Sequence, residues 1–523
     1  MRYLKNDSLN LLTIITFSSL LYLPFLGEPG FSGTSEFLYA TVSKEMLLGG
    51  HWVVPYFNGE AYYNKPPLFF WVVALLSKVA GEVTEVTARL PSAFSAIGTV
   101  LVTYFLGKNL FGPRAGLLAA LMLACSPKFH VFARVARLDA MYTFFITCAL
   151  ASFYYGYTHK QRIYLLLSGF AMGLAALTKG PLSLPFPAAS IFLYLAYSRD
   201  LRFLLRKDFF LSVILLLIPL LAWTVPAYIE GGKDYSSGFL SENISRYTTG
   251  RSRELIRALG YMGDLFIGLA PWAFFFPLIV YNYFSRRDKR EEMVFPLIWV
   301  AVIFLGFFLC LIRRSSYILP SYPAFCIVIA HFFDTHIPEG KLMKWPDVRT
   351  FGLCLIAILI GLITGKIANN PTVGTNYIIA VTFISIAFFA TLVILSIRSN
   401  SFYPFFLSCL ISLSICAISQ VFYFLPSISY LLSTRDLCKE VNGLVDNGAR
   451  LYIYRESNSR YSFYTNNKIS IIGNKDDLMR LLNSSERSYC IIRLKDYKSL
   501  NKNFSSLHAI ELGSDNRYLL LFN

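Results

Sequence analysis

Apolar residues in this chain occur in long blocks, and this feature constrains the fold more than any other. A helix that crosses a bilayer needs about 20 mostly apolar residues. Of the 523 residues, 55% are hydrophobic and 15% are charged, whereas soluble domains carry about 25% charged residues. These proportions exclude a soluble or disordered chain. We expect an α-helical polytopic membrane protein with about 13 transmembrane helices.

The candidate spans all lie within residues 1–427, which we predict to form one transmembrane domain. The first block is not a cleaved signal peptide, because no small-residue cleavage site follows Leu26 before the next structured stretch. A further apolar stretch at 67–80 is about 14 residues long, and we expect an interfacial or re-entrant helix there. The predicted spans are 10–26, 91–106, 115–127, 139–157, 163–177, 182–197, 209–228, 261–283, 294–312, 317–333, 351–365, 376–397 and 402–425.

The distribution of positive charge predicts the orientation. If 67–80 does not span, the loops on the N-terminal side hold about 18 Lys and Arg in about 64 residues, against about 16 in about 125 on the opposite side. The positive-inside rule then places the N-terminus in the cytoplasm. The net charge of +17 would raise nucleic-acid binding in a soluble protein. Here the loops assign much of it to topology, and we expect no nucleic-acid partner.

Three regions are predicted to leave the membrane on the outer face: a first loop at 27–90, a second large loop at 229–260, and a C-terminal segment at 428–523. The last alternates short strands and helices, which predicts a small soluble α/β domain. Cys438 and Cys490 fall in this domain, where a disulfide between them is one alternative and two free thiols the other.

Ionisable residues at the edge of a membrane are costly, so they are functional candidates by default. On the predicted outer side they gather in short segments that begin or end spans. No group of His and Cys has metal-ligand spacing, so we predict no metal site and no certain cofactor, and leave a divalent metal open. The candidate segments are 33–46, 62–68, 134–142, 178–181, 242–247, 270–272 and 313–320.

The order of these motifs resembles the GT-C glycosyltransferases that use polyprenyl-phosphate sugars. The likeness is strongest to the aminoarabinose transferases of lipid A, with the protein O-mannosyltransferases as more distant relatives. It runs from about residue 10 to 330. The matching positions are Glu36, Tyr39, Ala40 and Lys44–Met46 in the first loop, Lys65–Pro66, Arg137–Asp139, Thr178–Gly180 and Tyr317–Pro320.

The resemblance implies a division of labour between cations and carboxylates. Lys65, Arg137, Arg246, Arg314, Lys179 and Tyr317 would bind the donor phosphate, because preorganised cations stabilise a departing phosphate. Asp139 and Glu36 would be catalytic, orienting or deprotonating an acceptor hydroxyl and stabilising positive charge at the sugar ring. The candidate acceptor-site residues are Ser35, Tyr39, Asn64 and Asn243.

Ser35 departs from the family pattern, which has an aspartate at this position. A serine cannot replace a carboxylate as the base for a neutral hydroxyl. If the acceptor is already an anion, such as a lipid A phosphate, the reaction needs little base strength. Otherwise Glu36, Glu28 or Asp139 must serve. Asn64 and Asn243 likewise replace an acidic and a histidine residue of the family.

The sequence therefore predicts an enzyme of the bacterial inner membrane that transfers a sugar from undecaprenyl phosphate to lipid A or a related envelope acceptor, at an active site facing the periplasm. The resemblance also implies inversion at the anomeric carbon. One alternative is glycosyl transfer to protein Ser/Thr or to another glycan. Another is a lipid-linked sugar transporter or flippase without bond chemistry, which would place charged residues near the middle of its spans.

Overall fold

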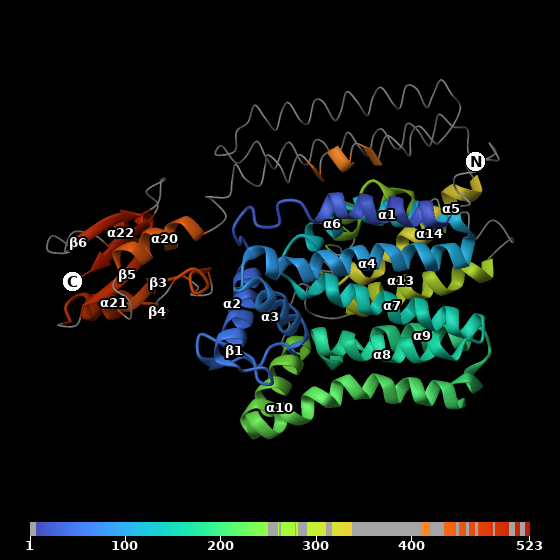
Figure 1. The fold of residues 1–523 in the computed structure, drawn as a ribbon, viewed down its shortest axis with the longest axis horizontal. Coiled ribbons are helices and arrows are strands. Elements are labelled where there is room, and N and C mark those ends of the chain that lie inside the picture. Colours follow the sequence, from blue (N-terminus) through green and yellow to red (C-terminus); the bar gives the residue numbers. More distant parts are fainter. Residues whose placement is uncertain are drawn as a thin grey trace. The chain divides into compact units, whose positions relative to one another are not determined.

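A computed structural model gives the fold (Figure 1). It describes residues 7–248, 263–277, 290–309, 316–336, 434–445, 449–456, 460–465, 469–484, 487–500, 508–512 and 518–522, together with 260, 279–280 and short pieces of 410–418. The predicted spans at 351–365 and 376–397, and most of 402–425, lie outside the described residues.

The chain divides into two compact units. The first comprises residues 1–24, 63–69 and 90–422, and the second comprises 25–62, 70–89 and 423–523. The second unit thus groups most of the predicted first loop with the C-terminal segment. The predicted domain boundary at 427/428 stays a prediction. Each unit is described by itself below.

The first unit is a bundle of apolar helices. Within it α7, α8 and α10 lie side by side (Figure 1). Proline occupies the first turn of α5, α6 and α9, where its missing N–H costs no intrahelical hydrogen bond. The helices are α1 (Asp7–Tyr22), α4 (Glu85–Phe111, which begins in the second unit), α5 (Pro113–Cys125), α6 (Pro127–Ala133), α7 (Leu138–Thr158), α8 (Arg162–Lys179), α9 (Pro185–Tyr197), α10 (Lys207–Thr248), α13 (Arg290–Leu309) and α14 (Tyr322–His336), with short 3₁₀ turns η2 (Pro181–Ser183), η3 (Leu201–Leu205), η4 (Trp272–Phe275) and η5 (Leu319–Ser321).

The contact between α8 and α10 depends on glycine. A Cβ atom at Gly169 would lie 1.8 Å from the carbonyl oxygen of Ser212, and one at Gly173 would lie 2.4 Å from that of Leu216. Small residues four apart allow helix backbones to approach closely in membranes. The Ser212 hydroxyl crosses the same interface and donates to the Leu165 carbonyl at 2.7 Å.

The described residues include three helices that are long and apolar enough to cross a membrane: Glu85–Phe111, Arg162–Lys179 and the Lys207–Lys233 part of α10. A fourth is possible if α5 and α6, which meet at a bend of 69°, count as one broken span. The predicted spans at 139–157 and 294–312 coincide with α7 and α13, of 21 and 20 residues, and four others coincide with helices of 13 to 16 residues, α1, α5, α9 and α14. The number thirteen stays a prediction. The apolar stretch at 67–80 forms α3 (Leu68–Ala80), whose 13 residues reach about 20 Å.

Residues 229–248, the described start of the predicted loop at 229–260, are helical. Helix α10 continues to Thr248 and changes direction at Gly232, whose φ of 65° lies in the left-handed region. A residue with a Cβ is strained there, which explains a glycine at the kink. That this segment leaves the membrane on the outer face stays a prediction.

The second unit contains α2 (Thr34–Gly49), the hairpin β1 (Tyr56–Phe57) and β2 (Glu60–Ala61), and a five-stranded mixed sheet ordered β4-β3-β5-β7-β6. Strands β3 (Arg450–Tyr454), β4 (Ile469–Ile472) and β5 (Ser488–Arg493) are parallel, whereas β6 (His508–Leu512) and β7 (Tyr518–Phe522) run antiparallel to their neighbours. Helices α20 (Arg435–Leu444), α21 (Lys475–Leu482) and α22 (Leu494–Leu500) complete this α/β fold.

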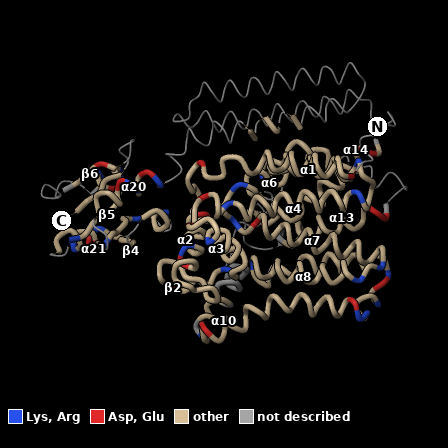
Figure 2. Tube along the Cα trace, in the orientation of Figure 1, with Lys and Arg blue, Asp and Glu red and all other residues tan. Residues whose placement is uncertain are grey.

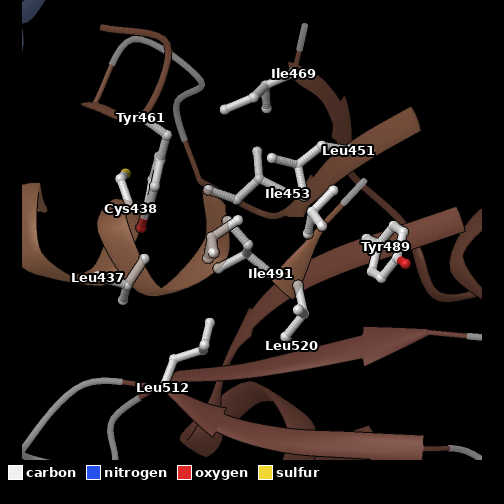
Figure 3. Close-up of a cluster of buried hydrophobic side chains, with 12 residues drawn as sticks. Leu437, Cys438, Leu451, Ile453, Tyr461, Ile469, Tyr489, Ile491, Leu512 and Leu520 are labelled. Carbon is white, nitrogen blue, oxygen red and sulfur yellow. The ribbon is translucent and has the colours of Figure 1, made fainter. Parts of the chain in front are cut away.

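Two hydrophobic cores cover opposite faces of the sheet, because side chains alternate along each strand. Leu437 and Cys438 of α20 pack against Ile453 and Ile491 on one face (Figure 3). Cys490, next to Ile491 on β5, belongs to the core on the other face with α21. Both cysteines are free and buried. The alternative of a Cys438–Cys490 disulfide is therefore wrong, since the sheet separates the two thiols.

Candidate active site

Asp139 lies between two cations in the first unit. It sits in the first turn of α7, and its side chain is 3% exposed. Its Oδ2 accepts from Arg137 Nε at 3.0 Å, and its Oδ1 accepts from Lys179 Nζ at 3.0 Å. One carboxylate thus joins the start of α7 to the end of α8. Two of the expected donor-phosphate ligands and one expected catalytic residue are brought together.

The local sequence explains why Lys179 reaches this point. Lys179 is the last residue of α8, and Gly180 follows with φ 107°, a conformation that L-residues with a Cβ rarely adopt. The ammonium group lies over two aromatic rings, 4.6 Å from the centroid of Tyr142 and 4.7 Å from that of Tyr317. Cation–π contacts of this kind hold a cation without neutralising it. Tyr317 is thereby placed in the same cluster.

Ser92 holds the backbone of Arg137, and the ring of Phe132 holds its guanidinium. The Ser92 hydroxyl donates to its carbonyl oxygen at 2.9 Å, and the guanidinium lies 5.1 Å from the ring centroid of Phe132. Its side chain is 28% exposed, against 11% for Lys179. Two cations and one carboxylate leave this cluster with one net positive charge. The buried carboxylate contacts both cations and so fixes their positions.

Lys65 and Asn64 lie in the segment that precedes α3, and both are partly buried. They belong to the same unit as Asp139. The neighbouring ring of Tyr63 packs against Tyr235 of α10, with centroids 5.2 Å apart. Oδ1 of Asn64 and the hydroxyl of Tyr235 are buried without a hydrogen-bond partner among the described residues.

Glu36 is engaged in a buried ion pair within the second unit. Arg89 donates from Nε and Nη2 to the two carboxylate oxygens, at 2.9 and 3.1 Å. Arg89 also donates to the carbonyl oxygens of Leu26 and Pro29, each at 2.7 Å. The side chains of Arg89 and Glu36 are 4% and 2% exposed. This geometry favours a structural role for Glu36, which shapes the 26–36 segment.

The other first-loop candidates lie on the same helix as Glu36. Ser35 is partly buried in the first turn of α2. Tyr39, one turn later, is buried, and its ring lies 5.7 Å from that of Phe70. Its placement suits packing against α3 better than contact with an acceptor. The roles predicted for Ser35 and Tyr39 stay predictions.

A turn of the C-terminal fold contacts the first-loop segment inside this unit. The Tyr464 hydroxyl donates to Glu85 Oε1 at 2.7 Å and accepts the Phe31 N–H at 2.9 Å. Arg435 pairs with Glu85 at 3.5 Å and with Glu28 at 3.1 Å. Glu28, an alternative base by sequence, is thus part of an ion pair.

Lys44 extends the same contact by donating to the Phe463 carbonyl at 3.1 Å. Burial lowers the pKa of its amine. Four aromatic rings surround this turn, with centroids between 4.9 and 6.0 Å apart along the cluster; they belong to Phe31, Phe37, Phe463 and Tyr464.

Three predicted site residues cannot be placed. Arg314 lies outside the described residues, and Asn243 and Arg246 fall in α10 with side chains that are not described. Among the residues that are described, no group of three His, Cys, Asp or Glu side chains could hold a metal ion.

The sequence motifs single out neither Arg89 nor Tyr464, and they include Tyr142 only as the last residue of the candidate segment 134–142. Arg89 lies just before an apolar block, so the rule that selects ionisable residues at span ends would have found it. Tyr142 follows Asp139 by three residues, which places both on one face of a helix. Nothing in the local sequence around Tyr464 predicts its contacts, because its partners Glu85 and Phe31 are 379 and 433 residues away.

Charged residues lie near the ends of the helices in the first unit. Figure 2 shows their middle parts almost free of Lys, Arg, Asp and Glu along α7, α8 and the first part of α10. Asp139 and Lys179 lie at one end of the α7–α8 pair, and Arg162 lies at the other. This pattern differs from that of a transporter with charges at the midplane.

Comparison with known structures identifies the fold. The chain superposes on ArnT from Cupriavidus metallidurans bound to undecaprenyl phosphate with a TM-score of 0.80, at 20% identity over 98% of this chain and 97% of that one. An oligosaccharyltransferase from Archaeoglobus fulgidus matches with a TM-score of 0.50, at 13% identity over 94% of this chain and 70% of that one. The fold is that of the GT-C membrane glycosyltransferases.

Residues 64–225 match the family described as dolichyl-phosphate-mannose-protein mannosyltransferase. An uncharacterised protein of Aquifex aeolicus is 32% identical over 60% of this chain and 62% of its own length. An undecaprenyl phosphate-α-4-amino-4-deoxy-L-arabinose arabinosyl transferase of Pseudomonas aeruginosa is 27% identical over 66% and 64%. The chain thus spans just under two thirds of the length of these relatives.

Proposed function

We propose that this protein is a membrane glycosyltransferase that moves a sugar from undecaprenyl phosphate to lipid A or a related envelope acceptor. The Arg137–Asp139–Lys179 cluster carries the proposal, because it presents two fixed cations around one buried carboxylate. The fold likeness to ArnT supports a lipid-phosphate donor. The resemblance of the motifs supports an active site on the periplasmic face of the inner membrane.

In the proposed reaction the bond between the anomeric carbon and the carrier phosphate breaks, and the phosphate leaves with the electron pair. Arg137 and Lys179 stabilise that charge, since preorganised donors act most strongly where charge develops. Asp139 holds both cations in place. Lys65 and Tyr317 are proposed as further donors to the same phosphate. An acceptor oxygen forms the new bond from the opposite face of the sugar.

The acceptor decides whether a base is needed. A phosphate oxygen of lipid A carries no proton, whereas a hydroxyl must lose one as the bond forms. Asp139 and Glu36 are both held in ion pairs, and Ser35 stands where the family has an aspartate. This set of side chains favours an anionic acceptor over the protein Ser/Thr alternative. The placement of charges at helix ends favours an enzyme over a transporter.

The test is transfer by the purified protein in lipid. With a radiolabelled undecaprenyl-phosphate sugar, we expect release of undecaprenyl phosphate and labelling of lipid A. Asp139→Ala and Lys65→Ala should each abolish the label. Asp208→Ala is the matched control, because that carboxylate pairs with Arg162 at the other end of the bundle and should leave transfer unchanged. Absence of transfer to any lipid, glycan or peptide acceptor would overturn the proposal.

A further inference from the structure

An apolar cavity of about 360 Å³ lies within the first unit, away from the candidate active site. Its walls come from α7, α8, α9, η3 and α10, and they include Phe153, Met172 and Ile191. Phe153 is 14 positions beyond Asp139 on α7, or about 21 Å along the helix axis. The cavity therefore belongs to the opposite end of the bundle.

Its size and lining suit a hydrocarbon chain. An engineered apolar cavity of about 150 Å³ holds benzene, and this one is more than twice as large. The lining contributes almost no polar surface apart from Ser168 and Ser212, and Ser212 already donates to a backbone carbonyl. Phe192 in the wall is exposed, and so are Leu167 and Phe210, each of which is next in sequence to a wall residue. An acyl chain from the surrounding lipid could enter without crossing a polar surface.

Positive charge surrounds one end of this cavity. Leu204, in the wall, lies between Arg202 and Arg206, and Phe209 follows Lys207 by two residues. Leu165, also in the wall, lies one helical turn after Arg162. Six exposed cations thus occupy segments 159–162 and 198–208, against the two acidic residues Asp200 and Asp208; the cations are Lys160, Arg162, Arg199, Arg202, Arg206 and Lys207.

The two carboxylates are already engaged. Asp208 pairs with Arg162 at 3.1 Å, and Asp200 pairs with Arg206 at 3.5 Å. Among the described residues, no ion pair is formed by Lys160, Arg199, Arg202 or Lys207. A topology signal requires positive charge at this end but does not require a cavity beside it. The two features together indicate a ligand with an apolar tail and an anionic head.

We propose that this cavity binds one acyl chain of an anionic phospholipid, with its phosphate held by the cations of segments 159–162 and 198–208. Cations near an anionic lipid surface contribute about 1 kcal/mol each, a factor of about five in affinity. The site is independent of the sugar-transfer reaction. Its lipid would come from the leaflet on the side of these two loops.

The test compares lipids with the same acyl chains on the purified full-length protein. Native mass spectrometry should show preferential retention of phosphatidylglycerol over phosphatidylethanolamine. Arg202→Gln with Lys207→Gln should reduce that preference about twenty-five-fold, because two cations are lost. Lys495→Gln with Lys498→Gln on α22 is the matched control for charge and should leave the preference unchanged.

A second pair of variants tests the cavity itself. Ala188 is part of the wall, and Ala188→Trp should fill the space and reduce retention of both lipids. Ala188→Leu, a smaller change, serves if the tryptophan variant does not fold. Equal retention of the two lipids by the unmodified protein would overturn the proposal. A second outcome would also overturn it. If either Ala188 variant raises the KM for the undecaprenyl-phosphate sugar and leaves lipid retention intact, the cavity is part of the donor site.

Discussion

Arg89 holds both carboxylate oxygens of Glu36, and its remaining donors bind three backbone carbonyls of the segment that leads into α2. The carbonyls belong to Leu26, Pro29 and Gly30. This pair therefore folds the segment around a single buried guanidinium. The ion pair with Arg89 explains the carboxylate of Glu36 without any proton transfer to or from a substrate.

Replacing Glu36 by alanine should destabilise the protein by about 3–5 kcal/mol, because Arg89 would be left as an uncompensated buried charge. The midpoint of thermal unfolding in detergent measures the loss. Glu82→Ala, which removes an exposed acid of the same unit, provides the comparison. A Glu36→Ala protein with unchanged stability and no turnover would instead make Glu36 catalytic.

Replacing Lys179 by methionine should reduce kcat/KM by a factor of about 100 to 1,000, which is typical for the loss of one preorganised donor. Methionine is unbranched and nearly as long, so it can still pack against the rings of Tyr142 and Tyr317 while the charge is lost. Lys179→Arg should recover part of the activity. Rates with saturating donor separate the loss of transition-state stabilisation from weaker binding. Wild-type rates for Lys179→Met would remove this residue from the phosphate site.

Arg137 should not tolerate lysine. The guanidinium reaches Asp139 through Nε, which leaves its terminal nitrogens for an anion, and a lysine offers one ammonium for both tasks. We expect Arg137→Lys to lower kcat/KM nearly as far as Arg137→Gln does. Isothermal titration with undecaprenyl phosphate provides a readout other than turnover. Equal binding by Arg137→Lys and the unmodified protein would contradict a bidentate role.

Ser35→Asp tests the identity of the acceptor. With a phosphate acceptor the added carboxylate should leave turnover unchanged or lower it by repelling the acceptor. With a hydroxyl acceptor it should raise turnover by supplying a base. The rate of labelling of lipid A with and without its phosphates distinguishes the two. A large gain on the native acceptor would count against an anionic acceptor.

The two buried thiols should be inert in the folded protein. Burial raises the pKa of Cys438 and of Cys490 to about 12, from about 9 in a solvated thiol. Between these values the unfolded thiols lose protons first, so stability should fall as the pH rises from 9 to 12. Iodoacetamide at pH 8 should label both only after denaturation. A mass change on reduction, without a denaturant, would reveal a disulfide that the geometry excludes.

How far the sequence predicts this structure depends on the range of the interaction. Apolar blocks predict most helix positions in the first unit, because burial in lipid is a local property of composition. The Thr178–Gly180 motif predicts that a helix ends near Lys179. It does not predict that Lys179 meets Asp139, since that pairing depends on how α7 and α8 pack.

The ion pair of Glu36 is likewise an interaction that the local sequence does not predict. A family motif marks the acid, while the arginine that neutralises it lies 53 residues later and outside the matching motifs. The contacts of Tyr464 span still greater separations, and only the folded chain reveals them. Identity and spacing therefore predict candidate residues, whereas a three-dimensional arrangement is needed to distinguish a base from a buried counter-ion.

The strand order of the C-terminal sheet bears on how this part of the protein is made. Strand β7 is the most C-terminal of the five, yet it lies between β5 and β6. As the chain emerges from the ribosome, β6 therefore has no neighbour to pair with until β7 has also been synthesised. A nonsense mutation before Tyr518 would leave β5 and β6 with unpaired edges, and quality-control proteases would then act on an otherwise nearly full-length membrane protein.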